Sequence, residues 1–204
     1  MRRQYADTNE EQENPRRLCR PSRWPRKALL FHNSFKEETI VLPTIILVVL
    51  IFLAFVKLTN MISYGWLKNK IVSSNTWDLN ICCGYTDGGG INADIVQHSE
   101  VPRFVRVDDI YSLPFASQQF DRVLCSHTIE HVDDPERFFD EMQRVGREVT
   151  LVLPPLWDLT AAFNILEHKH VFLTWRKKHN QLPRYVRLPF AGMVQKRWGQ
   201  TIKA

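Results

Sequence analysis

One stretch of the chain, from Trp77 to Pro155, constrains the fold most, because short apolar runs alternate there with turns. The runs cover residues 79–83, 91–95, 104–107, 120–125 and 149–153. Short apolar runs bounded by turn residues are typical of buried parallel strands. Asp94 lies at the end of the second run, Asp109 follows the third, and a glycine-rich turn follows the first. Parallel strands end at one edge of their sheet, so this order predicts two carboxylates and a flexible turn where open α/β sheets bind nucleotide-like ligands.

The same stretch predicts one helix and the loss of another. Asp134 and Pro135 form a helix start, as N-cap and first helical residue, and Gly146 marks the end. Between the first two runs there is only the turn from Tyr85 to Gly90, whereas a crossover between parallel strands usually contains a helix. We therefore expect a trimmed, Rossmann-like doubly wound α/β sheet whose first crossover helix is missing or reduced to a turn.

An apolar segment precedes this stretch. Residues 40–56 read IVLPTIILVVLIFLAFV without a charge, which meets the lower limit of about 17 residues for a membrane-spanning helix. Tyr64 and Trp66 follow it and have the character of an interfacial anchor. A buried core helix and a secretory signal peptide are the alternatives, but residues 1–39 precede the segment and no small-residue cleavage site follows it. We predict a transmembrane and interfacial anchor over residues 40–67, after a disordered basic tail over residues 1–39.

The positive charge is concentrated at the C-terminal end. The formal net charge is +5, and from His168 onward there is no Asp or Glu but nine Lys or Arg. A segment of one sign predicts an acidic partner, either a membrane surface or nucleic acid. Because the domain starts close to the predicted anchor, we expect anionic lipid headgroups and no nucleic acid.

Several residues have types and positions suited to binding a nucleoside-like ligand. Asp94 can accept hydrogen bonds from a ribose diol, or it can be a capping carboxylate. Asp109 can contact the base, with Asp108 as the adjacent alternative. Gly84 allows close approach of the backbone at the first turn, unless it is an ordinary turn glycine.

These residues belong to a region that resembles a class I S-adenosylmethionine-dependent methyltransferase of the type 11 kind. The resemblance rests on Leu113-Pro114-Phe115, Phe120-Asp121, Ile129-Glu130-His131, Asp134-Pro135 and the helix end Glu141-Met142-Gln143-Arg144-Val145. It identifies residues 73–204 as a methyltransferase-like domain with S-adenosylmethionine as cofactor.

The resemblance also implies roles for individual residues. Asp94 would bind the cofactor ribose and Asp109 the adenine end, while Gly84 and its neighbour Cys82 would surround the methionine part. Ser126 and His127 would face the sulfonium side. The first motif departs from the family pattern, with Asn80, Cys82 and Thr86 at positions of an acid and two glycines, and Gly88, Gly89 and Gly90 are the candidates to compensate.

A general base is needed only if the acceptor is a hydroxyl or a carbon acid, and histidine titrates near neutrality. His127 and His131 are the predicted catalytic residues, although His131 also suits a structural role before the helix. His168 and His170 lie in an alternating run that suggests a sixth strand, and because no third ligand is evident we expect no metal. Residues 185–188 are expected to be the last strand of the sheet.

The sequence therefore predicts methyl transfer to a small-molecule or membrane-associated acceptor, such as a lipid or lipid-linked molecule. The chemistry requires the C-terminal domain in the cytoplasm, although the flanking charges lean toward an internal N-terminus. The alternative is a degenerate methyltransferase fold that acts as a membrane-anchored interaction module. A dinucleotide-dependent reductase is disfavoured, because no Gly-x-Gly-x-x-Gly opens a helix after the first strand.

Overall fold

The computed structural model describes residues 26–199, and side-chain environments from residue 41 to residue 199. The chain divides into two compact units, residues 1–48 and 49–204. Helix α1 (Arg26–Asn60) runs through the boundary and continues as the π-helical segment η1 (Met61–Leu67) and helix α2 (Lys68–Ser73). Residues 1–25 of the predicted tail lie outside the described part. Residues 26–39 are helical, consistent with the good helix formers Ala, Leu, Lys and Glu in that stretch.

The helical segment carries the predicted membrane anchor. Within the described part of the chain, the helical stretch Val41–Ser73 is long and apolar enough to cross a membrane, with a mean hydropathy of 2.8 in its most apolar window. Its side chains from Val41 to Phe55 are largely exposed, which soluble proteins rarely allow for so many neighbouring apolar residues. This agrees with a spanning helix by length and composition.

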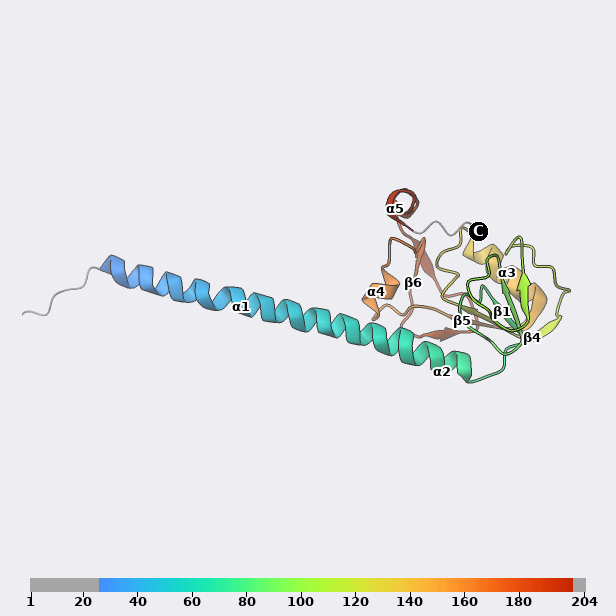
Figure 1. Ribbon diagram of the computed structural model, residues 1–204. Helices are drawn as coiled ribbons and strands as arrows, with labels where there is room; N and C mark the ends of the chain where they lie inside the picture. The colour runs from blue at the N-terminus through green and yellow to red at the C-terminus, as the bar shows by residue number, and fades with distance from the viewer. Residues whose placement is uncertain (1–25, 200–204) are drawn as a thin grey trace, which may run out of the picture. The chain divides into compact units, whose positions relative to one another are not determined.

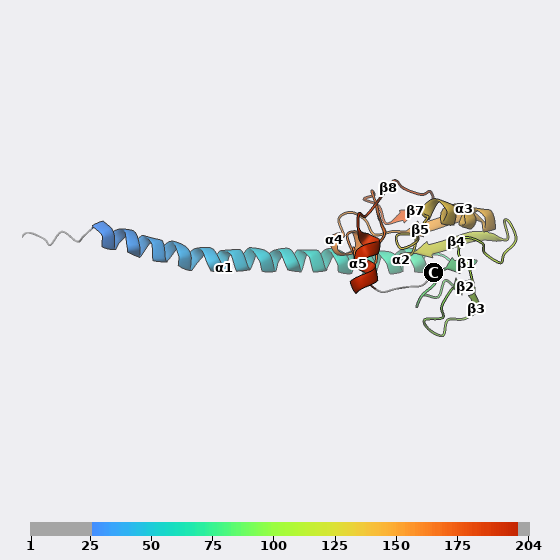
Figure 2. The same cartoon turned by 90° about the horizontal axis from the view of Figure 1, so that it is seen from above.

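The second unit contains a central six-stranded sheet in the order β3-β2-β1-β4-β5-β7 (Figures 1 and 2). All neighbouring strands are parallel except β7, which pairs antiparallel with β5. The predicted mostly parallel α/β sheet is confirmed. The strands are β1 (Leu79–Ile81), β2 (Ile91–Asp94), β3 (Phe104–Arg106), β4 (Phe120–Ser126), β5 (Gly146–Val152) and β7 (Lys178–His179).

Successive residues of β4 point to opposite faces of the sheet and join two different hydrophobic clusters. Val123 belongs to the larger cluster, which includes Phe138 and Met142 of α3 (Pro135–Val145). Leu124 belongs to the smaller one, with Val72 of α2. Helix α3 therefore covers one face and α2 the other.

The predicted helix signals are confirmed at α3. The Asp134 side chain accepts a 3.0 Å hydrogen bond from the Arg137 amide, and Pro135 is the first helical residue. Gly146 does not form a left-handed cap but starts β5 directly, with extended backbone. A Cβ at this position would overlap Val123 of the neighbouring strand, which explains why glycine stands there.

The crossover from β1 to β2 contains no helix, as predicted. It runs back along β1 so closely that a Cβ on Gly90 would overlap the carbonyl oxygens of Trp77 and Asp78. A Cβ on Gly88 would come within 2.7 Å of the Asn80 Cβ. Gly88 and Gly90 therefore allow the crossover to pack closely against β1.

The C-terminal part differs from the prediction. Strand β6 (His170–Phe172) pairs with β8 (Tyr185–Arg187) in a separate two-stranded antiparallel sheet. The last strand of the main sheet is β7 and not residues 185–188. Strand β7 pairs with β5, and the Leu153 amide after β5 donates to the Lys177 carbonyl before β7, which extends this pairing. Two short helices complete this part, α4 (Leu159–Ala162) and α5 (Ala191–Trp198).

Candidate functional site

The strand order reverses between β1 and β4, which are neighbours in the sheet but not in sequence. In open α/β sheets ligands bind in the crevice outside the carboxyl ends of the strands at this switch point. Cys82 follows β1 and His127 follows β4, and both have left-handed backbone, with φ of 52° and 55°. Left-handed conformations of non-glycine residues are uncommon and cluster at functional sites. The predicted residues Cys82 and His127 thus flank the switch point.

Asp94 is the last residue of β2 and is buried. Its Oδ2 accepts a 2.9 Å hydrogen bond from the Gly84 amide, and its Oδ1 accepts one of 2.8 Å from the Ile95 amide. Gly84 has φ of +55°, and no atom lies within 4 Å of the place a Cβ would take. A hydrogen bond thus connects Asp94 and Gly84, two of the predicted cofactor-binding residues, and there is open space beside Gly84.

Ser126 and Cys82 lie at the ends of the two central strands. Ser126 is the last residue of β4, and its buried Oγ has no hydrogen-bond partner among the described residues. Burial, with the nearby Cys125 and Asp94, raises the pKa of the Cys82 thiol well above its usual value. Cys82 is therefore a neutral thiol that suits contact with an apolar or sulfur-bearing group rather than nucleophilic attack.

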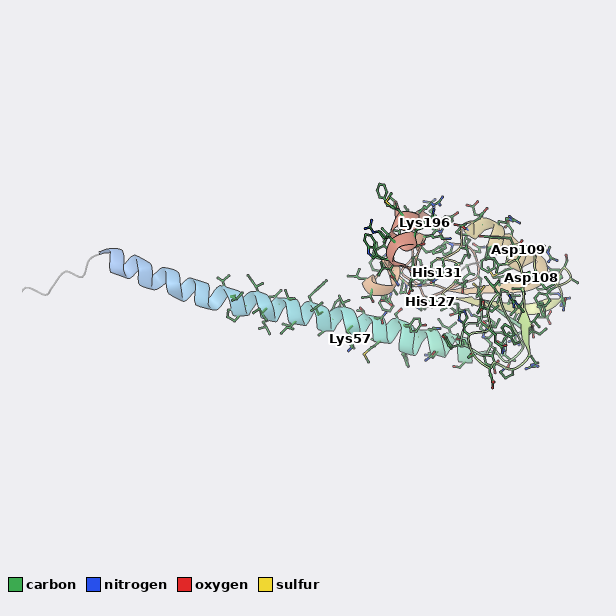
Figure 3. The ribbon with its side chains drawn as sticks, turned by 45° about the horizontal axis from the view of Figure 1, so that its top comes forward. Lys57, Asp108, Asp109, His127, His131 and Lys196 are labelled. Carbon is green, nitrogen blue, oxygen red and sulfur yellow. The ribbon has the colours of Figure 1, made fainter. Side chains whose placement is uncertain are left out.

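Asp109 and its neighbour Asp108 are exposed after β3. The Asp109 Oδ1 accepts a 2.8 Å hydrogen bond from the Tyr111 amide, so it closes a local turn. Figure 3 shows both aspartates apart from His127 and His131. Asp109 follows the strand next to β2, which is compatible with a contact at the far end of a ligand held by Asp94.

His127 is held by two charged side chains. Its Nδ1 lies 3.2 Å from Oε1 of Glu130, and its Nε2 lies 2.7 Å from Nζ of Lys177. Lys177 also donates a 2.9 Å hydrogen bond to Oγ of Ser63 in η1, and the Tyr64 ring meets the His127 ring edge-on at 5.2 Å. Burial lowers the pKa of His127 and lowers that of Lys177 to about 8.

His131 and His168 are two further histidines near Glu130. Nδ1 of His131 donates to the Glu167 carbonyl oxygen at 2.9 Å, and Nε2 of His168 lies 3.9 Å from Oε1 of Glu130. Burial alone would raise the pKa of Glu130, but the hydrogen bond and charge of His127, with His131 and His168, hold it at about 2. The structure thus brings the two predicted catalytic histidines to one buried carboxylate.

Two residues of this cluster were not predicted as functional. Glu130 belongs to the motif Ile129-Glu130-His131, so its place in the sequence was noted. The motif gave no indication that the Glu130 side chain is fully buried. Lys177 stands in the one-signed C-terminal run, where nothing distinguishes it from its neighbours. Only its long-range contacts with Ser63 and His127 reveal it.

A hollow of about 390 Å³ lies between α2 and the crossover. It is lined by Asn69, Val72, Ser73, Asn75, Thr76, Asp87, Gly88 and Gly89. Gly88 and Gly89 were candidates to compensate for the first motif, but none of the other predicted cofactor-binding or catalytic residues lines this hollow.

Comparison with known proteins finds methyltransferase similarity in the central part of the domain. The profile of a family described as "Methyltransferase domain" matches residues 91–151. A malonyl-[acyl-carrier protein] O-methyltransferase of Hahella chejuensis (strain KCTC 2396) is 29% identical over 106 residues, which cover 49% of this chain and 38% of the relative. The chain thus matches well under half of the length of that relative.

Among solved structures, a SAM-dependent methyltransferase of Thermotoga maritima is similar with 18% identity and a TM-score of 0.34, over 46% of this chain and 54% of the other. The PH0226 protein of Pyrococcus horikoshii OT3 has 16% identity and a TM-score of 0.37, over 68% and 79% of the two chains. The family match over residues 91–151 includes the motifs around Phe120-Asp121 and Asp134-Pro135, and it supports the predicted class I methyltransferase domain.

Proposed function

We propose that this chain is an S-adenosylmethionine-dependent methyltransferase that acts on an acceptor held at a membrane surface. The observation that carries the proposal is the hydrogen bond from the Gly84 amide to Asp94, at the carboxyl end of β2 in the matched domain. Doubly wound folds bind a ribose through an acidic side chain at this position. Gly84 beside it leaves room for close approach of a ligand.

The residues at the switch point fit the cofactor. Each Asp94 oxygen keeps a lone pair for a ribose hydroxyl after accepting one backbone bond. The unpartnered Ser126 hydroxyl and the neutral Cys82 thiol would line the methionine side, and Asp109 would lie toward the adenine. When bound, the cofactor supplies an electrophilic methyl group on sulfur. The protein then has to hold the acceptor atom in line with that group.

For an acceptor that loses a proton, we assign the base to His127. While Lys177 is charged, its ammonium donates a hydrogen bond to Nε2 of His127. When this bond is released, Nε2 is free to take the proton that the methyl acceptor loses. His131 is the second predicted base, but its Nδ1–H is committed to the Glu167 carbonyl. We therefore give His131 no proton-transfer role in the proposal.

The membrane location is part of the proposal, with the domain on the cytoplasmic side where the cofactor is made available. Asn60, at the end of α1, donates to both carboxylate oxygens of Asp158 at 3.2 and 3.3 Å, so the start of α4 lies beside the helix that follows the apolar segment. Exposed apolar side chains follow Asp158, namely Leu159, Phe163, Ile165 and Leu166. With the basic residues of the C-terminal run, they support contact with anionic lipid and an acceptor that is a lipid or lipid-linked molecule.

The proposal is tested by calorimetric titration of the full chain, in detergent micelles, with S-adenosylhomocysteine. We expect binding to weaken at least tenfold in Asp94→Asn, which keeps the acceptor for the Gly84 amide but removes the charge that favours two ribose hydroxyls. Asp140→Asn, at an exposed position of α3, is the matched control, and Asp109→Ala and Asp108→Ala measure the adenine-end contact. A folded wild-type chain that binds no S-adenosylhomocysteine would instead be an anchored interaction module.

A further inference from the structure

We propose that Glu130, His131 and His168 form a binding site for one divalent d-block cation of the zinc type. The site goes beyond methyl transfer and does not depend on it. It also reverses the expectation of no metal, which rested on the lack of a third ligand near His168 and His170. The structure supplies the missing ligands from a segment 37 or more positions earlier in the sequence, the loop after β4.

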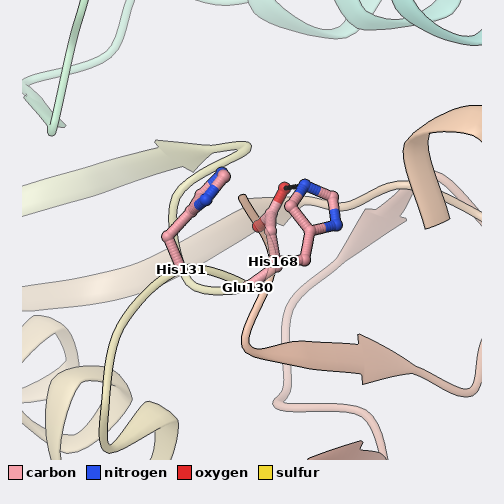
Figure 4. A group of neighbouring side chains, drawn as sticks. All are labelled: Glu130, His131 and His168. Atoms are coloured by element: carbon pink, nitrogen blue, oxygen red, sulfur yellow. Dashed lines mark ion pairs between the residues drawn. The ribbon is translucent and has the colours of Figure 1, made fainter. Parts of the chain in front are cut away.

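The three side chains converge on one point. One ligand atom from each of them lies within 4.8 Å of the others (Figure 4). The rings of His131 and His168 meet edge-on with centroids 4.7 Å apart. Ligands of a tetrahedral zinc ion lie roughly 3.3 Å apart, given bonds of about 2.0–2.2 Å. Small side-chain rotations would therefore close the cluster around an ion.

The strongest sign of a missing partner is the Glu130 carboxylate. Glu130 is fully buried. Nδ1 of His127 approaches its Oε1 at 3.2 Å, but its Oε2 has no hydrogen-bond partner among the described residues. His168 is also buried, with an unpartnered Nδ1. Buried charges are normally paired with well-placed donors or coordinate a metal. A cation would satisfy the carboxylate.

The orientation of His131 suits metal coordination. Its Nδ1–H donates to the Glu167 carbonyl, which leaves the Nε2 lone pair free. Histidines that bind metals usually donate their other ring N–H to a carbonyl or carboxylate in this way, because the bond fixes the tautomer and the ring. His127, with Nδ1 at 3.2 Å from Oε1 of Glu130, would support the carboxylate from outside.

The backbone keeps the two segments together. The amides of Lys169 and His170 both donate to the Glu130 carbonyl, at 2.8 and 3.1 Å. The site is therefore built on paired backbone and not on free surface side chains. Two imidazoles and one carboxylate favour zinc and similar cations over magnesium or calcium, which prefer oxygen ligands. Three protein ligands leave one position of a tetrahedron for water.

The test uses the full chain with a tag that contains no histidine, stripped with a chelator in detergent and then titrated with Zn²⁺ and with Co²⁺. We expect one Zn²⁺ per chain by elemental analysis, visible bands of tetrahedral Co²⁺, and a higher unfolding temperature with metal. His168→Gln and Glu130→Gln should each weaken Zn²⁺ binding at least tenfold.

His170→Gln is the matched control. His170 is also buried with an unpartnered Nδ1, but its ring faces Tyr185 at 5.1 Å instead of Glu130. It should bind Zn²⁺ like the wild type. If the folded wild type binds no Zn²⁺ or Co²⁺, or if His168→Gln binds as well as His170→Gln, the site is a metal-free ion cluster and the proposal fails. Binding of S-adenosylhomocysteine to the stripped chain, measured in parallel, shows whether the methyltransferase proposal stands by itself.

Discussion

Nζ of Lys177 lies 2.7 Å from Nε2 of His127, although the two residues are 50 positions apart. The same ammonium donates to Ser63 in η1, so one buried lysine connects the helix after the apolar segment with the residue that follows β4. A charged lysine can only donate, and it therefore places the His127 proton on Nδ1, toward Glu130. The candidate base and η1 are thus parts of one polar network.

Burial of Lys177 makes the stability of this network depend on pH. Burial lowers the pKa of Lys177 in the folded chain from an ordinary value of 10.5 to about 8. The positive charge of Lys68 lowers this pKa further, whereas the negative charges of Asp158 and Glu130 raise it. Between these two values the unfolded chain binds more protons than the folded chain, so the free energy of unfolding rises with pH. The rise amounts to roughly 3 kcal/mol over the whole window.

This is measured by urea unfolding of the full chain in detergent at several pH values from 7.5 to 10.5, for wild type and Lys177→Met. The wild type should gain stability relative to Lys177→Met as pH rises. Lys178→Met, which changes an exposed neighbour, should follow the wild type. Parallel curves for wild type and Lys177→Met would mean that Lys177 keeps its ordinary pKa.

The glycines of the first crossover give a second prediction. Gly90→Ala places a Cβ on the carbonyl oxygens of Trp77 and Asp78, so the crossover must move away from β1. We expect a loss of about 1–3 kcal/mol, typical of overpacking in a core. Gly192→Ala is the control, because nothing lies within 4 Å of its Cβ position in α5 and alanine favours helices. Equal unfolding temperatures for the two variants would contradict the close packing.

A third prediction concerns Asn92, whose buried amide holds the crossover in place. Its Oδ1 accepts from Asn80 and from the Gly88 amide, both at 3.0 Å, and its Nδ2 donates to Asp87 and to the Pro102 carbonyl, both at 2.8 Å. Asn92→Leu removes the acceptor of the buried Gly88 amide and one of the two acceptors of the buried Asn80 amide, whereas Asp87 and Pro102 are exposed and can bond to water. Each unsatisfied buried group costs about 1–3 kcal/mol.

Asn92→Asp is the informative comparison. It keeps the two acceptor bonds but replaces the Nδ2 donor by a charge beside Asp87, whose own pKa is lowered mainly by the Asn92 hydrogen bond. We expect it to be destabilised at pH 7 and partly restored at pH 5, where one of the two carboxyls can be protonated. Thermal unfolding of the full chain at both pH values checks this, and a variant that is insensitive to pH would contradict the assigned bonds.

The sequence predicted those parts of the fold that depend on local signals. Asp134 and Pro135 define the start of α3, and the apolar runs define the first five strands of the sheet, because capping and burial patterns are readable within a few residues. The missing crossover helix followed from the short distance between the first two runs. The expected disorder of residues 26–39 did not account for their helix formers.

The site was predictable only in part for the same reason. The positions of Asp94 and Ser126 at strand ends, and of Gly84 in the turn after β1, were predictable because the apolar runs give the order of the strands. The meeting of Glu130 with His168, and of Lys177 with His127, depends on how the segment after α4 folds back onto the loop after β4. Such long-range contacts leave no periodic signal in one sequence, and therefore the expected absence of a metal ligand set rested on local spacing alone.

The last prediction tests the proposed membrane contact of the α4 region. Phe163 is 52% exposed directly after α4, whereas Tyr85 is 78% exposed in the crossover. Asn60 and Asp158 tie α4 to the end of α1, so Phe163 should lie at the lipid headgroups and Tyr85 away from them. The Phe163→Cys and Tyr85→Cys variants of the full chain are labelled at cysteine with a polarity-sensitive dye and placed in nanodiscs. The unsubstituted chain, labelled in the same way, measures the emission that comes from the native cysteines. Addition of anionic lipid should shift the Phe163→Cys emission to the blue and leave that of Tyr85→Cys unchanged, because basic residues of the C-terminal run attract such lipids. The same emission at both positions, in neutral and in anionic nanodiscs, would place the α4 region in water and remove the support for a lipid-held acceptor.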